Sequence, residues 1–128
     1  MSKRLLVVDD DAEFVDEASR LLELDGFEVQ RAYDGRQALQ TLVNQRDREP
    51  CVILLDLGMP VMDGWQLLAV MRSYARLSRI PIVLYTAHEV PAHVRPAFRD
   101  ILRKPVEANQ LVETVRRVCG CGTTPRAA

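Results

Sequence analysis

Acidic residues directly follow two apolar stretches of this sequence. Asp56 comes after the apolar run from Cys51 to Leu55, and Asp9 and Asp10 come after Leu5 to Val8. Unbroken apolar runs bounded by polar or turn residues are typical of strands buried on both faces of a parallel sheet. A carboxylate at that depth is costly unless a cation or hydrogen-bond donors meet it. The positions of these acids therefore indicate a chemical role rather than a contribution to stability.

Two further polar residues follow expected strands in the same way. Thr86 comes after Ile80 to Tyr85, and Lys104 comes after Ile101 to Arg103. Clustered carboxylates repel one another unless a divalent cation neutralises them, and Mg2+ prefers two carboxylates, a backbone carbonyl and waters. A metal beside a free carboxylate oxygen, with a lysine and a hydroxyl opposite, suits a phosphoryl group and an in-line nucleophile. The set predicts an aspartyl phosphate.

The elements that must position these residues alternate along the chain. Strand and helix patterns follow each other five times, which predicts one α/β domain with a doubly wound parallel sheet and helices on both faces. In such sheets the functional crevice lies at the carboxyl ends of the strands. The polar residues named above all stand at those ends, so four separate strands are expected to contribute to one site.

Several local signals mark the expected helices. Asp11 is the expected N-cap of the first helix and Gly26 its C-terminal glycine, while Asp34 and Gln37 form a capping-box pattern for the second. Asp63 and Gly64 are interpreted as a turn and helix start, not as chemistry. Pro91 and Pro96 bracket the place of the fourth helix, and a proline in a helix interior costs about 3 kcal/mol. We expect that helix to be short or irregular.

The composition of the chain limits which classes of protein it can belong to. The chain has 128 residues, 48% apolar content and a net charge of -1, with basic residues spread along it, which predicts one domain over 1–119 and no nucleic-acid patch. No apolar run is long enough to span a membrane. Three cysteines without a signal peptide predict reduced thiols and a cytoplasmic protein. Cys119-Gly-Cys121 lacks the spacing of a redox or zinc motif, and residues 120–128 are expected to be a flexible tail.

Taken together, the motifs resemble a response-regulator receiver domain of two-component signalling over residues 3 to 119. The matching motifs are Val7-Val-Asp9-Asp10, Asp56-Leu-Gly-Met-Pro60-Val-Met-Asp63-Gly64, Thr86-Ala87 and Lys104-Pro105. Each is weak alone, and jointly they are specific. The resemblance implies the flavodoxin-like strand order 2-1-3-4-5 of chemotaxis-type single-domain receivers.

The resemblance also implies roles for the acids. Asp56 would be the phosphoacceptor, and Asp9 and Asp10 would hold Mg2+. Asp10 would be the more direct metal ligand, Asp56 the second ligand and the backbone carbonyl of Gly58 the third. The phosphoryl donor would be a phosphohistidine on a sensor histidine kinase or a histidine phosphotransfer protein.

The remaining motif residues would act on the phosphoryl group. Lys104 would pair with its oxygens, Thr86 would move to hydrogen-bond them, and small Ala87 would leave room. Pro105, often preceded by a cis bond in such domains, would fix the lysine's loop. His88 would lie at the mouth of the site or be solvated. The signal would pass by contact with an unknown downstream protein, with no nucleic acid or membrane as partner, and a homodimer is a further option.

Two departures from the family leave alternatives open. The position three before the lysine is usually aromatic but is Ile101 here, and the span from Thr86 to Lys104 is short, 104-86=18 residues. Both changes lie in the region through which the family signals. A receiver-fold adaptor that works without phosphorylation is therefore the alternative. An aspartyl phosphatase is disfavoured because Gly58 replaces the second acid such enzymes need, so slow self-dephosphorylation is the only expected catalysis.

Overall fold

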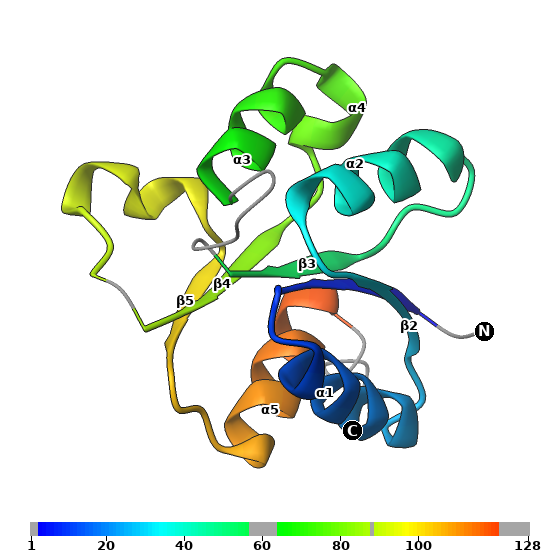
Figure 1. Ribbon diagram of the computed structural model, residues 1–128, viewed down its shortest axis with the longest axis vertical. Coiled ribbons are helices and arrows are strands. Elements are labelled where there is room, and N and C mark those ends of the chain that lie inside the picture. The colour runs from blue at the N-terminus through cyan, green and yellow to red at the C-terminus, as the bar shows by residue number, and fades with distance from the viewer. Residues whose placement is uncertain (1–2, 57–63, 88, 121–128) are drawn as a thin grey trace.

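Five parallel strands form the centre of the molecule in the computed structural model, which describes residues 3–56, 64–87 and 89–120 (Figure 1). Their order in the sheet is β2-β1-β3-β4-β5, and every neighbouring pair is parallel. The doubly wound fold and the strand order 2-1-3-4-5 expected from the sequence are both confirmed. The strands are β1 (Arg4–Val8), β2 (Glu28–Ala32), β3 (Val52–Leu55), β4 (Ile82–Thr86) and β5 (Asp100–Arg103).

Helices cover both faces of this sheet. Two of them, α1 (Ala12–Leu24) and α5 (Ala108–Cys119), lie side by side on one face, and α2 (Gly35–Asn44) and α3 (Gly64–Arg72) lie on the other (Figure 1). Side chains alternate along a strand, so Leu5 and Val7 of β1 pack in the α1–α5 layer whereas Leu6 and Val8 pack in the opposite layer. Strands buried on both faces explain the unbroken apolar runs in the sequence.

The predicted helix signals are found where the sequence places them. Asp11 caps α1 by accepting a hydrogen bond from the Phe14 N–H at 3.3 Å. Asp34 caps α2 by accepting one from the Gln37 N–H at 2.8 Å, and the Gln37 side chain accepts one in turn from the Tyr33 N–H. Gly26 has φ +97°, a left-handed conformation that favours glycine at the end of a helix. The turn interpretation of Asp63 lies outside the described residues.

The proline-bracketed segment after β4 is irregular, as expected. It forms a 3-10 helix, η1 (Ala92–Ala97), with Pro96 inside it. A short helix that the sequence did not reveal, α4 (Ala75–Ser78), follows α3 and buries Leu77 in the core of the α2–α3 layer. Four residues are too few to show a helical period, which explains why α4 was missed.

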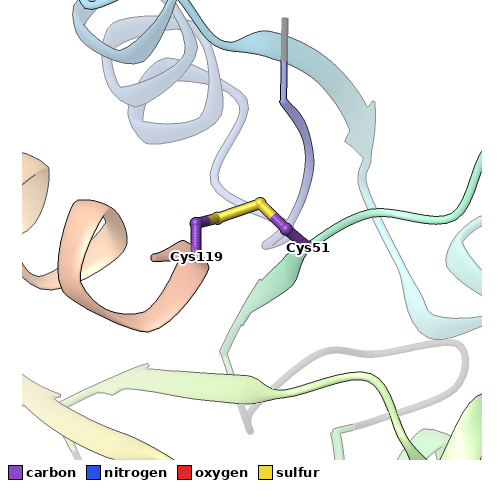
Figure 2. Close-up of a disulfide and its surroundings, with 2 residues drawn as sticks. All are labelled: Cys51 and Cys119. Carbon is purple, nitrogen blue, oxygen red and sulfur yellow. A yellow bond between two sulfur atoms is a disulfide. The ribbon is translucent and has the colours of Figure 1, made fainter. Parts of the chain in front are cut away.

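A disulfide corrects one expectation from the cysteine count. Cys51, just before β3, is bonded to Cys119, the last residue of α5 (Figure 2). The prediction that all three cysteines are reduced thiols is therefore wrong for this pair. The two residues are 68 positions apart in the sequence, and only the packing of α5 across the sheet brings their Cα atoms to 5.2 Å. Cys121 and the expected tail beyond Gly120 lie outside the described residues.

No helix in the described part of the chain is long and apolar enough to cross a membrane.

Candidate functional site

Three carboxylates meet at the carboxyl ends of β1 and β3. Each of Asp9, Asp10 and Asp56 offers an oxygen, and these oxygens all lie within 4.8 Å of one another. The register explains the meeting, because Val8 pairs with Leu55 and the Asp56 N–H donates a hydrogen bond to the Val8 carbonyl at 3.0 Å. The acids that end the two strands are therefore neighbours, as the sequence predicted.

The three carboxylates differ in burial. Asp9 is 1% exposed and Asp56 is 6% exposed, whereas Asp10 is exposed. Burial raises the pKa of Asp9 to about 6, and a hydrogen bond from the Asp11 N–H at 3.1 Å opposes that rise. The charge of Asp56 raises the pKa of Asp9 further, and Lys104 lowers it in part. A buried, ionised Asp9 beside Asp56 is unfavourable without further positive charge.

Lys104 supplies part of that positive charge. Its ammonium Nζ lies 3.1 Å from Oδ2 of Asp9 and 3.7 Å from Oδ1 of Asp56. Burial lowers the pKa of Lys104, but the hydrogen bond to Asp9 and the charges of Asp9 and Asp56 outweigh it, so the net shift is upward. Lys104 therefore stays cationic between two strand ends.

The donor set fits a divalent cation. Three carboxylates and one ammonium carry a formal charge of -3+1=-2, so a doubly charged ion balances the cluster. Carboxylate oxygens are the ligands that Mg2+ prefers, and exposed Asp10 leaves the cluster open to solvent for entry. The expected contribution of the Gly58 carbonyl lies outside the described residues.

Thr86 and Lys104 are joined through the backbone at the ends of β4 and β5. Thr86 is fully buried as the last residue of β4, and its carbonyl accepts a hydrogen bond from the Lys104 N–H at 3.0 Å. Ala87 follows it and is exposed. The peptide bond between Lys104 and Pro105 is cis, as the resemblance implied. Four strand ends thus contribute to one site, and His88 lies outside the described residues.

Two aromatic residues at the site were not singled out by the sequence. Phe14, in the first turn of α1, stacks on Tyr85 of β4, with ring centroids 4.1 Å apart and planes 10° from parallel. The Lys104 ammonium lies 4.8 Å from the Tyr85 centroid and 5.7 Å from that of Phe14. The sequence marked both residues only as apolar, and the sole available signal was that Tyr85 immediately precedes Thr86.

Proteins of known sequence resemble this chain over most of its length. It is 35% identical over 119 residues to the transcriptional regulatory protein PrrA of Mycobacterium tuberculosis, covering 90% of this chain and 49% of PrrA. It is 33% identical over 120 residues to an uncharacterized 14.6 kDa protein of Leptolyngbya boryana, covering 90% of this chain and 88% of that protein. The chain spans about half the length of PrrA and of the DNA-binding response regulator MtrA.

Solved structures also resemble this chain over most of its length. The chemotaxis protein CheY4 of Vibrio cholerae superimposes with a TM-score of 0.81 at 30% identity, covering 92% of this chain and 99% of CheY4. A putative response regulator from Chloroflexus aurantiacus gives a TM-score of 0.81 at 29% identity, covering 94% of this chain and 99% of its own. The family model of the response regulator receiver domain matches residues 5–116 of this chain. With the strand order and the acidic site, these matches establish that the chain belongs to the response-regulator receiver domain family.

Proposed function

We propose that this chain accepts a phosphoryl group on Asp56, in the presence of Mg2+, as one step of a two-component phosphorelay. The observation that carries the proposal is the juxtaposition of a buried Asp56 with two further carboxylates and the Lys104 ammonium at 3.7 Å. Receiver domains are signalling phosphoacceptors rather than enzymes in the usual sense. We therefore expect only slow hydrolysis of the aspartyl phosphate.

The proposed transfer is a displacement at phosphorus. A carboxylate oxygen of Asp56 forms the new bond to phosphorus while the bond from phosphorus to the donor's imidazole nitrogen breaks. The electron pair of the broken bond stays on the imidazole, which takes a proton from solvent. Lys104 lies where its ammonium can neutralise charge on the phosphoryl oxygens.

Asp9, Asp10 and Asp56 are the proposed ligands of Mg2+ among the described residues, with the backbone carbonyl of Gly58 completing the predicted set. When bound, the metal would supply the positive charge that stabilises the equatorial phosphoryl oxygens. Before binding, Asp9 is held by Lys104 and by the Asp11 N–H, and Asp56 is paired with Lys104. The protein's own part is to keep these oxygens together at two strand ends.

Thr86 and Ala87 are proposed to complete the phosphoryl site. Thr86 stands at the end of β4, next to β3, and its hydroxyl is proposed to hydrogen-bond the phosphoryl oxygens after transfer. Ala87 is exposed and small, so it leaves space at the mouth of the site. Both roles are consistent with the backbone hydrogen bond that joins Thr86 to Lys104.

The proposed partners follow from this chemistry. The donor is a sensor histidine kinase or a histidine phosphotransfer protein, and the output is a contact with a further protein. PrrA is named as a transcriptional regulator and MtrA as DNA-binding, but this chain matches only about half of each. A cytoplasmic location is part of the same proposal, because phosphohistidine donors are made from ATP.

Intact-mass spectrometry tests the assignment of Asp56. The protein is incubated with acetyl phosphate, with and without Mg2+, as wild type, Asp56→Asn and Asp100→Asn. Asp100 begins β5 and pairs with Arg117, away from the site, so its variant is the matched control. One Mg2+-dependent phosphoryl adduct in wild type and control, absent in Asp56→Asn, is expected. Full labelling of Asp56→Asn would refute the assignment.

A second candidate function is an adaptor with the receiver fold that binds its partner equally well with and without phosphorylation. Ile101 favours the adaptor, because it is a smaller apolar residue at the position where the family usually has an aromatic side chain. It is half buried and packs against the same apolar layer as Val94 and Ala97 of η1. Amide chemical shifts over residues 86–119 discriminate: a clear change on phosphorylation excludes the adaptor, and unchanged shifts in labelled protein favour it.

A further inference from the structure

The Lys104 side chain is long, flexible and only partly enclosed. Its side chain is 25% exposed, and its ammonium must lie between Asp9 and Asp56 to serve the site. A lysine has four rotatable carbon–carbon bonds and a compact charge, so its position is not set by covalent geometry alone. The two carboxylates attract the ammonium, and further contacts can limit where it lies.

The stacked rings of Phe14 and Tyr85 also lie close to the ammonium. Tyr85 is 7% exposed and belongs to β4, whereas Phe14 is half buried in α1. The near-parallel stack, 4.1 Å between centroids, fixes the two rings against each other. The ammonium lies within about 6 Å of both centroids, the range in which a cation is attracted to an aromatic face.

The backbone places these groups together independently of the side chains. Tyr85 pairs with Leu102 in the β4–β5 register, and the Lys104 N–H bonds the carbonyl of Thr86, the residue after Tyr85. The backbone of Lys104 is thus held at the end of β5 beside β4, and its ammonium lies over the Tyr85 ring. Phe14 comes from the helix that begins directly after the acidic run, so α1 links the ring stack to the carboxylates.

We infer that Phe14 and Tyr85 form an aromatic platform that positions the Lys104 ammonium for phosphoryl transfer to Asp56. The platform is defined as the two stacked rings, and each is a positioning residue that acts through Lys104. The inference rests on the proposed function, since it names what orients the cation of that same site. A plain packing role predicts the same burial but not the placement of both rings within cation–π distance of the one lysine.

Matched variants separate positioning from packing. Tyr85→Leu and Phe14→Leu remove a ring, Tyr85→Phe keeps it, and Leu111→Ala weakens the same apolar layer at a residue of α5 that carries no ring. We expect ring removal to slow labelling at limiting acetyl phosphate roughly fivefold, as for a lost cation–π contact. Tyr85→Phe and Leu111→Ala should label at close to the wild-type rate.

A second readout does not depend on phosphorylation. NMR relaxation of the Lys104 ε-methylene, measured in the same variants without Mg2+ or phosphodonor, reports how tightly the side chain is held. The order parameter should fall in Tyr85→Leu and Phe14→Leu and stay unchanged in Tyr85→Phe and Leu111→Ala. An unchanged order parameter and labelling rate after ring removal would overturn the platform.

The remaining outcomes are equally decisive. If Leu111→Ala slows labelling and loosens Lys104 as much as Tyr85→Leu does, the effect is general destabilisation and the platform is refuted. If wild type forms no adduct under any condition, the proposed function fails, and the methylene relaxation alone decides whether the rings hold the lysine. The two failures are thus distinguishable.

Discussion

The Lys104 ammonium lies 3.1 Å from the buried carboxylate of Asp9, a residue 95 positions away in the sequence. Asp9 is 1% exposed and Lys104 is the cation that the structure places against it. A partly buried pair of this kind costs more to break than a surface pair, because the remaining charge is left without a counter-ion. The expected properties of the site follow from this contact.

Replacing Lys104 with Met should destabilise the Mg2+-free protein by about 1–3 kcal/mol, because Asp9 and Asp56 then repel each other without a counter-ion. Added Mg2+ should restore part of the lost free energy of unfolding by replacing that charge. Urea denaturation with and without Mg2+ measures both effects. Arg103→Met is the control, since Arg103 pairs with exposed Glu89 at 3.4 Å and should change stability little. Equal losses in the two variants would contradict the prediction.

Asp9→Asn should stabilise the Mg2+-free protein at neutral pH. Burial raises the pKa of Asp9 from 3.8 to about 6, so the folded state binds more protons than the unfolded state between those values. The Asp9 contribution therefore makes wild type less stable as pH rises from about 4 to 6, by on the order of 1–3 kcal/mol. Asparagine does not ionise, so the Asp9→Asn variant does not lose stability in this way as pH rises.

The difference in unfolding free energy between Asp9→Asn and wild type should thus be smallest below pH 4 and largest above pH 7. Urea titrations of both proteins across this pH range in EDTA give the difference directly. The contributions of the other carboxylates are the same in both proteins and cancel. A difference that does not vary with pH, or that grows as pH falls, would show that Asp9 is not the group responsible.

The three consecutive acids after β1 should separate into different roles. Asp11→Ala removes the cap that accepts the Phe14 N–H and should cost about 1 kcal/mol of stability, with little change in Mg2+ affinity. Asp10→Asn should leave stability nearly unchanged, because Asp10 is exposed, but should weaken Mg2+ binding by roughly tenfold or more. Calorimetric Mg2+ titrations and urea denaturation of both variants make the test. Equal effects on metal affinity would mean that the roles are misassigned.

Reducing the Cys51–Cys119 disulfide should lower stability without changing the chemistry of the site. Closing a loop across 68 positions contributes about 4 kcal/mol in the chain-entropy view. Cys51 precedes β3 and Asp56 follows it, so the bond and the phosphoacceptor lie at opposite ends of one strand. Thermal unfolding of oxidised, reduced and Cys51→Ser protein should show the loss, with labelling by acetyl phosphate unchanged.

Peptide mapping of the oxidised protein checks which cysteines are joined. Cys121→Ser is the control variant and should retain both the disulfide and the melting temperature of wild type. A Cys51–Cys121 linkage, or free thiols after air oxidation, would contradict the pairing of Cys51 with Cys119.

The sequence predicted the fold because its signals are local. Alternating apolar runs and caps such as Asp11 and Asp34 can be recognised without knowing any tertiary contact, and the strand-end positions of Asp56 and Lys104 follow from the parallel sheet. The strand order itself came from the resemblance to receiver domains.

What the sequence could not supply depends on which side chains face each other. The Cys51–Cys119 contact requires α5 to lie across β3, and an odd cysteine count cannot reveal it. The Phe14–Tyr85 stack needs the relative placement of a helix turn and a strand, whereas the sequence marks both residues only as apolar. The short helix α4 has too few residues to produce a periodic pattern.

The disulfide also divides the chain topologically. It closes residues 51–119 into a covalent ring that contains Asp56, Thr86 and Lys104, while Asp9 and Asp10 enter from the open arm before it. A protease that cuts once inside the ring therefore releases no fragment until the disulfide is reduced. A cut between Asp10 and Cys51 instead separates the arm's two carboxylates covalently from the phosphoacceptor, leaving only non-covalent contacts, among them the pairing of β1 with β3, to keep them in the site.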